Sequence, residues 1–116
     1  MFITKSILND DYLKALNILT ENLKDKYHVF YGMRLSEIVF PASEYGSDEF
    51  FKAFEMINGI VAPLLVYDLL ERKPVMVIGF GTLEGVDFFK CAGIDGVVIE
   101  QLKDLLIDER IVCLYK

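Results

Sequence analysis

Among its 116 residues the chain has two cysteines, one histidine and no tryptophan. A tetrahedral zinc site built from nitrogen and sulfur needs three or four such ligands, and Cys91 and Cys113 are too far apart to form a short ligand motif. These counts exclude a structural zinc site made by one chain. Both cysteines lie in apolar segments, so we expect them to be buried, in a reducing compartment. His28 has no acid or nucleophile beside it, which predicts a surface or core-edge histidine rather than a catalytic base.

The sequence also lacks a long apolar run. No stretch approaches the roughly 18–20 apolar residues that cross a bilayer, and acids appear at Asp10 and Asp11 before any signal-peptide core. We therefore expect a cytoplasmic protein with no membrane partner. Hydrophobic residues make up 53% of the chain and charged residues 26%. This composition predicts a single folded α/β domain over residues 1–116 and not a disordered chain.

Basic residues are few and scattered. Lysine and arginine number 12 against 18 aspartates and glutamates, which gives a formal net charge of −6. Nucleic-acid binding depends on cations that neutralise phosphates, and no basic stripe with interleaved aromatics is present, so we expect no direct nucleic-acid binding. An acidic small domain is suited to a basic protein partner, although acidity also serves solubility.

The spacing of apolar residues predicts alternating helices and strands. We expect helices over residues 10–24, 47–58, 82–92 and 101–107, a short turn at 36–40, and strands over 27–35, 60–67, 75–80, 97–99 and 110–115. Ser47 and Thr82 are the expected N-caps, and Gly59 and Gly93 the expected helix stops. The prediction is a mixed central sheet of about five strands with helices on both faces, in the order α-β-(α)-β-β-α-β-α-β.

Six short fragments follow one another in the order helix, three strands, helix once an insert at residues 36–59 is set aside. They are LKAL at 13–16, YHVF at 27–30, MRLSEI at 33–38, LLVYD at 64–68, PVMVI at 74–78 and FFKCAGI at 88–94. With the strand that follows, this order and these fragments resemble the restriction-endonuclease-like, or PD-(D/E)XK, fold.

In active members of that family, an acid at the start of the second strand and an acid-x-lysine on the third hold a divalent ion and position an attacking water. The corresponding positions here are Pro63, Gly79 and Gly81, which offer neither carboxylate nor ammonium. Asp68 lies beyond the strand and fits a hairpin turn better than a metal ligand. Lys90 could be a migrated catalytic lysine, but without two acids to hold a metal ion it would not activate a water molecule. The resemblance therefore implies an inactivated nuclease fold, with no catalytic residue, metal or cofactor.

A glycine-rich turn allows a competing interpretation. Gly79, Gly81 and Gly85 lie where a predicted strand passes into a predicted helix, and Glu100 lies about 20 residues further on, which is the layout of a dinucleotide site. The spacing is G-x-G-x-x-x-G rather than G-x-G-x-x-G, and acids at the start of the helix would repel phosphate. We favour close packing or a bulge as the reason for Gly79 and Gly81. Whether the turn contacts a ligand stays open.

The insert carries the candidate partner-binding residues. Glu44, Asp48 and Glu49 form the densest acidic patch, and the adjacent Phe50 and Phe51 cannot both face inward on one helix, so one is an expected exposed anchor. We predict a non-catalytic interaction domain, in its concrete form an acidic inhibitor or immunity-type protein that acts on a basic, nucleic-acid-handling partner. The alternatives are a divergent nuclease or nucleotide-binding enzyme, and a small structural subunit of a larger assembly.

Overall fold

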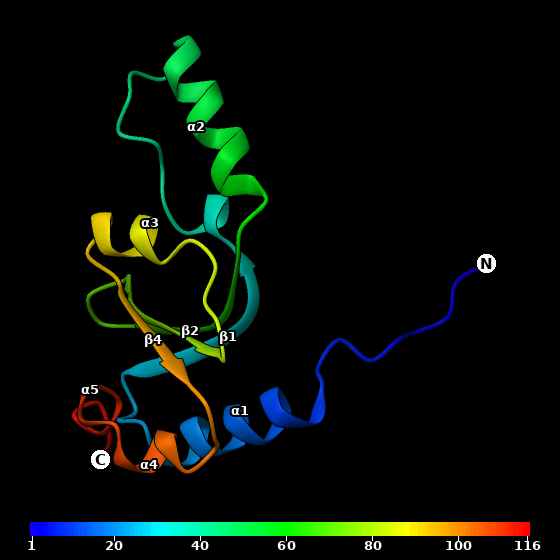
Figure 1. Cartoon of the computed structure of the whole chain (residues 1–116), viewed down its shortest axis with the longest axis vertical. Coiled ribbons are helices and arrows are strands. Elements are labelled where there is room, and N and C mark those ends of the chain that lie inside the picture. The colour runs from blue at the N-terminus through cyan, green and yellow to red at the C-terminus, as the bar shows by residue number, and fades with distance from the viewer.

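A four-stranded sheet lies at the centre of the computed structural model, which describes all 116 residues (Figure 1). Its strands are β1 (Tyr27–Arg34), β2 (Val61–Asp68), β3 (Lys73–Phe80) and β4 (Asp95–Ile99), and they lie side by side in that order. β1 and β2 are antiparallel, as are β2 and β3, whereas β4 runs parallel to β3. The predicted α/β class and mixed sheet are confirmed.

Helices lie on both sides of this sheet (Figure 1). α1 (Asp10–Asn22), α4 (Asp104–Ile107) and α5 (Glu109–Val112) lie on one side, and α3 (Val86–Cys91) and the 3-10 turn η1 (Leu35–Glu37) lie on the other. α2 (Asp48–Asn58) rises from this second side and extends away from the sheet. None of the helices combines the length and the apolar character that a membrane crossing requires.

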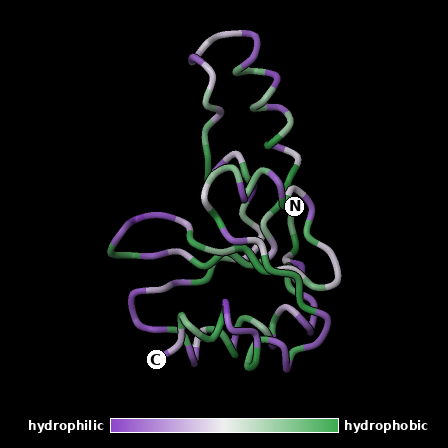
Figure 2. Tube along the Cα trace, turned by 60° about the vertical axis from the view of Figure 1, so that its left-hand side comes forward, coloured by the Kyte–Doolittle hydropathy of each residue, from purple (hydrophilic) through white to green (hydrophobic).

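Two separate hydrophobic cores hold the layers together. The core on the α1 side contains Leu19 from α1 and Leu64 and Ile78 from the strands, and the core on the α3 side contains Leu65 and Phe89. Neighbouring residues of a strand point to opposite sides of the sheet, so the central strands β2 and β3 contribute side chains to both cores. Their hydrophobic path through the middle of the molecule is visible in Figure 2.

Local hydrogen bonds explain where the first two helices begin. The Asn9 side chain accepts a hydrogen bond from the Tyr12 amide at 2.9 Å, and the Ser47 hydroxyl accepts one from the Phe50 amide at 3.1 Å. Each serves an amide that the first helical turn leaves without a partner, and each helix begins with two acids that suit its positive end. Both predicted starts are confirmed.

The hairpin between β2 and β3 depends on a buried carboxylate. Oδ1 of Asp68 accepts hydrogen bonds from the amides of Leu70 and Glu71, both at 2.9 Å, and the Lys26 Nζ lies 3.5 Å from Oδ2. The Glu71 amide above all, with the Leu70 amide and Lys26, holds the pKa of Asp68 below its ordinary value despite desolvation. Asp68 therefore organises the turn, as predicted.

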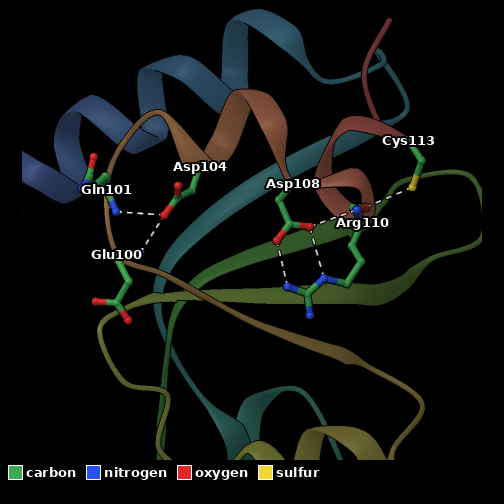
Figure 3. A network of polar contacts seen from close by, with 6 residues as sticks. All are labelled: Glu100, Gln101, Asp104, Asp108, Arg110 and Cys113. Carbon is green, nitrogen blue, oxygen red and sulfur yellow. Dashed lines mark hydrogen bonds and ion pairs between the residues drawn. The ribbon is translucent and has the colours of Figure 1, made fainter.

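The predicted fifth strand is wrong. Residues 110–112 belong to α5, and the one strand-like pairing within residues 110–115 is an isolated bridge between Tyr115 and Leu23. The Asp108 carboxylate accepts hydrogen bonds from the Arg110 amide at 3.0 Å and from its guanidinium at 3.1 and 2.8 Å (Figure 3). This capping starts a helix where the apolar run alone favoured a strand. The chain thus has four strands and ends in two short helices.

The predicted third and fourth helices are shorter than expected. α3 begins at Val86 after Gly85 in the left-handed region, so the prediction of Thr82 as its cap is wrong, whereas Gly93 does follow its end. In the C-terminal region, the Asp104 carboxylate accepts hydrogen bonds from the amides of Glu100 and Gln101 (Figure 3). These bonds hold residues 100–103 as a turn ahead of α4.

The prediction that both cysteines are buried is also wrong. Cys91 and Cys113 are exposed free thiols. Cys91 is the last residue of α3 and belongs to neither hydrophobic core. Cys113 donates a hydrogen bond to the Arg110 carbonyl oxygen at 3.0 Å. Tertiary packing, which the local apolar pattern does not describe, decides the exposure of both.

Candidate functional site

The insert at residues 36–59 contains a small aromatic cluster around Phe50. Phe50 is buried, with its ring centroid 5.0 Å from that of Tyr45, 5.7 Å from that of Phe51 and 6.3 Å from that of Phe54. It belongs to neither of the two cores of the sheet. Phe51 keeps 53% of its surface exposed. The prediction that only one of the adjacent phenylalanines is buried is confirmed.

Exposed acids surround this cluster. Asp48 and Glu55 lie three residues before and four residues after Phe51, so all three share one helical face. Glu44 lies just before the helix, where the Ser47 hydroxyl and amide donate hydrogen bonds to its carbonyl oxygen at 2.6 and 3.1 Å. The three predicted acids Glu44, Asp48 and Glu49 therefore lie at the start of α2 and are all exposed.

The acids of the insert have no basic partners. The three ion pairs of the structure are elsewhere in the chain. Residues 36–59 contain five acidic side chains and one lysine, so they carry four of the six net negative charges. A small projecting element thus holds most of the chain's excess negative charge.

A hollow of about 390 Å³ separates α2 from α3, and we call it the α2–α3 hollow. Apolar side chains form most of its wall, among them Phe40, Ala53, Met56 and Phe88, and Lys52 stands at its edge. Sequence reasoning missed it, because a hydrophobic pattern shows which residues prefer burial and not whether two helices meet.

Of the three positions that match the nuclease motif, Gly79 has no room for a side chain. Gly79 is fully enclosed: a Cβ placed on it would lie 2.6 Å from the Thr82 carbonyl oxygen and 3.3 Å from Leu83 Cδ1. Pro63 lies on the neighbouring strand β2, and Gly81 is exposed with φ of +70°. No group of three histidine, cysteine or acidic side chains lies close enough together to hold a metal ion.

The glycine-rich turn has a structural reason at each of its glycines. Close packing explains Gly79, as predicted, and a positive φ explains Gly81, whose amide donates a hydrogen bond of 2.8 Å to the Ile99 carbonyl oxygen. Gly85 combines φ of +79° with a Cβ position only 2.8 Å from Ile60 Cγ2. The turn therefore joins β3 to β4 and packs α3 against the sheet.

His28 is a surface histidine, as the sequence predicts. It is exposed on β1, and its ring centroid is 4.7 Å from that of Phe30. Phe30 in turn contacts Tyr67 edge to face at 6.0 Å. The three rings form an aromatic row on the side of the sheet that α3 covers only in part, which the sequence alone did not suggest.

Comparison with known proteins adds no family to this description. No family model, curated protein or solved structure matches the chain. The resemblance to restriction-endonuclease-like domains stays a prediction from the sequence fragments and their order.

Proposed function

We propose that this chain is a non-catalytic interaction domain that binds a basic, nucleic-acid-handling protein through residues 36–59, as an inhibitor or immunity-type protein would. The observation that carries the proposal is the exposed Phe51 on a projecting helix, with Asp48 and Glu55 on the same helical face. Aromatic side chains that become desolvated on binding often dominate the binding energy. Unpaired charges around them favour a partner of the opposite sign.

The residues at the three positions of the nuclease motif, Pro63, Gly79 and Gly81, support the proposed absence of catalysis. A carboxylate at position 79 would have to displace the Thr82 carbonyl oxygen and the Leu83 side chain. Proline and glycine occupy the other two positions. An acidic domain on a nuclease-like scaffold that lacks the metal-binding carboxylates is suited to binding a partner rather than to cleaving nucleic acid.

In this proposal the acids and the aromatic ring act at different stages of binding. The negative potential around α2 accelerates the encounter with a basic surface, because long-range attraction guides diffusion and weakens as salt is added. Phe51 then loses its contact with water in the bound state and slows dissociation. The acids therefore determine mainly the association rate, and Phe51 mainly the dissociation rate.

Reversing the charges of Glu44, Asp48 and Glu49 to lysine should slow association with the basic partner by about tenfold or more at low salt and flatten its salt dependence. The matched control reverses Asp10, Asp11 and Glu21 on α1, which changes the net charge equally and also places two lysines in the first turn of a helix. Stopped-flow or surface-based kinetics at two salt concentrations compares the variants, after circular dichroism has shown that each is folded. Equal slowing by the control variant would show that only net charge matters and would contradict the proposed site.

A further inference from the structure

Two more hollows adjoin the α2–α3 hollow on the same side of the sheet. One of about 400 Å³ shares Val39 and Ala92 with it, and another of about 410 Å³ continues from there, sharing Ile38 and Pro74. The last of these reaches the aromatic row, where Phe30 and Tyr67 form part of its wall. The three hollows together form what we call the sheet-face groove.

The charges along the sheet-face groove have the opposite sign to the rest of the protein. Three cations line it, Lys52, Arg72 and Lys73, against a single acid, Glu37. None of the three cations takes part in an ion pair. A chain of net charge −6 thus presents an apolar groove edged by free positive charges. Such a groove complements a ligand that is both apolar and acidic.

Arg72 has a backbone conformation that is unusual for a side chain of its size. It is the one residue other than glycine with a positive φ, at 57°. This backbone region favours glycine or asparagine, and a side chain such as arginine is strained there. At this place in the hairpin turn between β2 and β3 the chain has arginine where glycine or asparagine is usual. Here Arg72 lines the same hollow as Phe30 and Tyr67 of the aromatic row.

From these observations we infer that the sheet-face groove binds a peptide segment of a partner protein that combines large apolar side chains with carboxylates. The apolar side chains enter the hollows, and the carboxylates pair with Arg72, Lys73 and Lys52. A nucleic acid is disfavoured as the occupant because three separated cations neutralise few phosphates and the wall between them is apolar. This inference does not rest on the proposed function, because Arg72 and Lys73 lie outside residues 36–59 and pair with the charge opposite to that which the acids at the start of α2 attract.

A synthetic peptide with phenylalanines and glutamates in a serine–glycine background tests the inference by fluorescence anisotropy. We expect saturable binding that weakens about five- to tenfold in the double variant Arg72→Asn/Lys73→Ser, which removes two pairing cations. The control Lys5→Ser/Lys14→Ser loses the same charge from the N-terminal segment and α1 and should bind as the wild type does. Arg72→Asn alone should melt no lower than the wild type, because asparagine tolerates the left-handed region.

Several outcomes would overturn the inference. They are no saturable binding at millimolar peptide, equal binding by a peptide in which serine replaces phenylalanine, or equal weakening by the two double variants. Binding that is kept in the Arg72→Asn/Lys73→Ser variant and strengthened by reversal of Glu44, Asp48 and Glu49 to lysine would place the peptide on the insert instead. Self-association of the protein that only the Arg72→Asn/Lys73→Ser variant abolishes, without peptide binding, would make a second copy of the chain the occupant and also contradict the inference.

Discussion

Replacing Gly79 with alanine is expected to lower the free energy of unfolding by about 1–3 kcal/mol, the usual cost of forcing an extra group into a packed interior. The added methyl would meet the Thr82 carbonyl oxygen at 2.6 Å. The backbone just before that carbonyl is held in place, because the Gly81 amide donates a hydrogen bond to the Ile99 carbonyl oxygen and the Thr82 amide donates one to the Phe80 carbonyl oxygen. Urea unfolding followed by circular dichroism measures the loss.

Gly81→Ala is the matched control for this prediction. No atom lies within 4 Å of the position a Cβ would take, so the cost comes from the positive φ of 70° alone and should be about 1 kcal/mol. Gly79→Asp should be less stable than Gly79→Ala and should not cleave DNA or RNA with Mg²⁺ or Mn²⁺. A stable Gly79→Asp protein with metal-dependent cleavage would refute both the packing argument and the proposed absence of catalysis.

Phe89→Ala should destabilise the fold by about 3–5 kcal/mol, the range for removing a fully buried phenylalanine. Phe89 is 0% exposed and is one of the largest side chains in the core on the α3 side. α3 has only six residues, so tertiary packing rather than its own hydrogen bonds must hold it in place. The same unfolding measurement applies here.

The neighbouring Phe88 provides the comparison. It is 38% exposed and lines the α2–α3 hollow, so Phe88→Ala should cost about 1 kcal/mol or less. Equal losses for the two variants would show that α3 is not anchored through Phe89. A larger loss for Phe88→Ala would mean that the hollow is closed by packing rather than open to a ligand.

Elements fixed by local chemistry were the predictable part of this fold. Asn9 and Ser47 cap their helices because each places an oxygen three residues before an unpaired amide, and Asp68 shapes the hairpin in the same way. Residues 110–115 were not predictable from their apolar content, because the run suits a strand and a short helix equally. Asp108 selects the helix, because its carboxylate accepts hydrogen bonds from the amide and the guanidinium of Arg110.

The candidate site also has one part that the sequence predicts and another part that it does not. The exposure of Phe51 follows from its position beside Phe50, since one helix cannot bury two consecutive rings on the same face. The sheet-face groove depends on the separation of α2 from α3 and on how much of the sheet α3 leaves uncovered, and neither is encoded locally. One signal was present: the hairpin turn between β2 and β3 contains no glycine or asparagine, so a residue such as Arg72 has to adopt the left-handed conformation.

The most direct test of the interaction site is photo-crosslinking from position 51. A photoreactive phenylalanine analogue at Phe51 should form a covalent adduct with a basic protein in extract of the cells that naturally produce this chain, identified by mass spectrometry. The control places the analogue at Leu106 on α4, which has a similar exposed fraction of 55% against 53% but lies on the opposite side of the sheet. We expect an adduct from position 51 that disappears when Glu44, Asp48 and Glu49 are reversed, and none from position 106. The same adducts from both positions, or adducts from position 51 that survive the reversal, would contradict the proposed site.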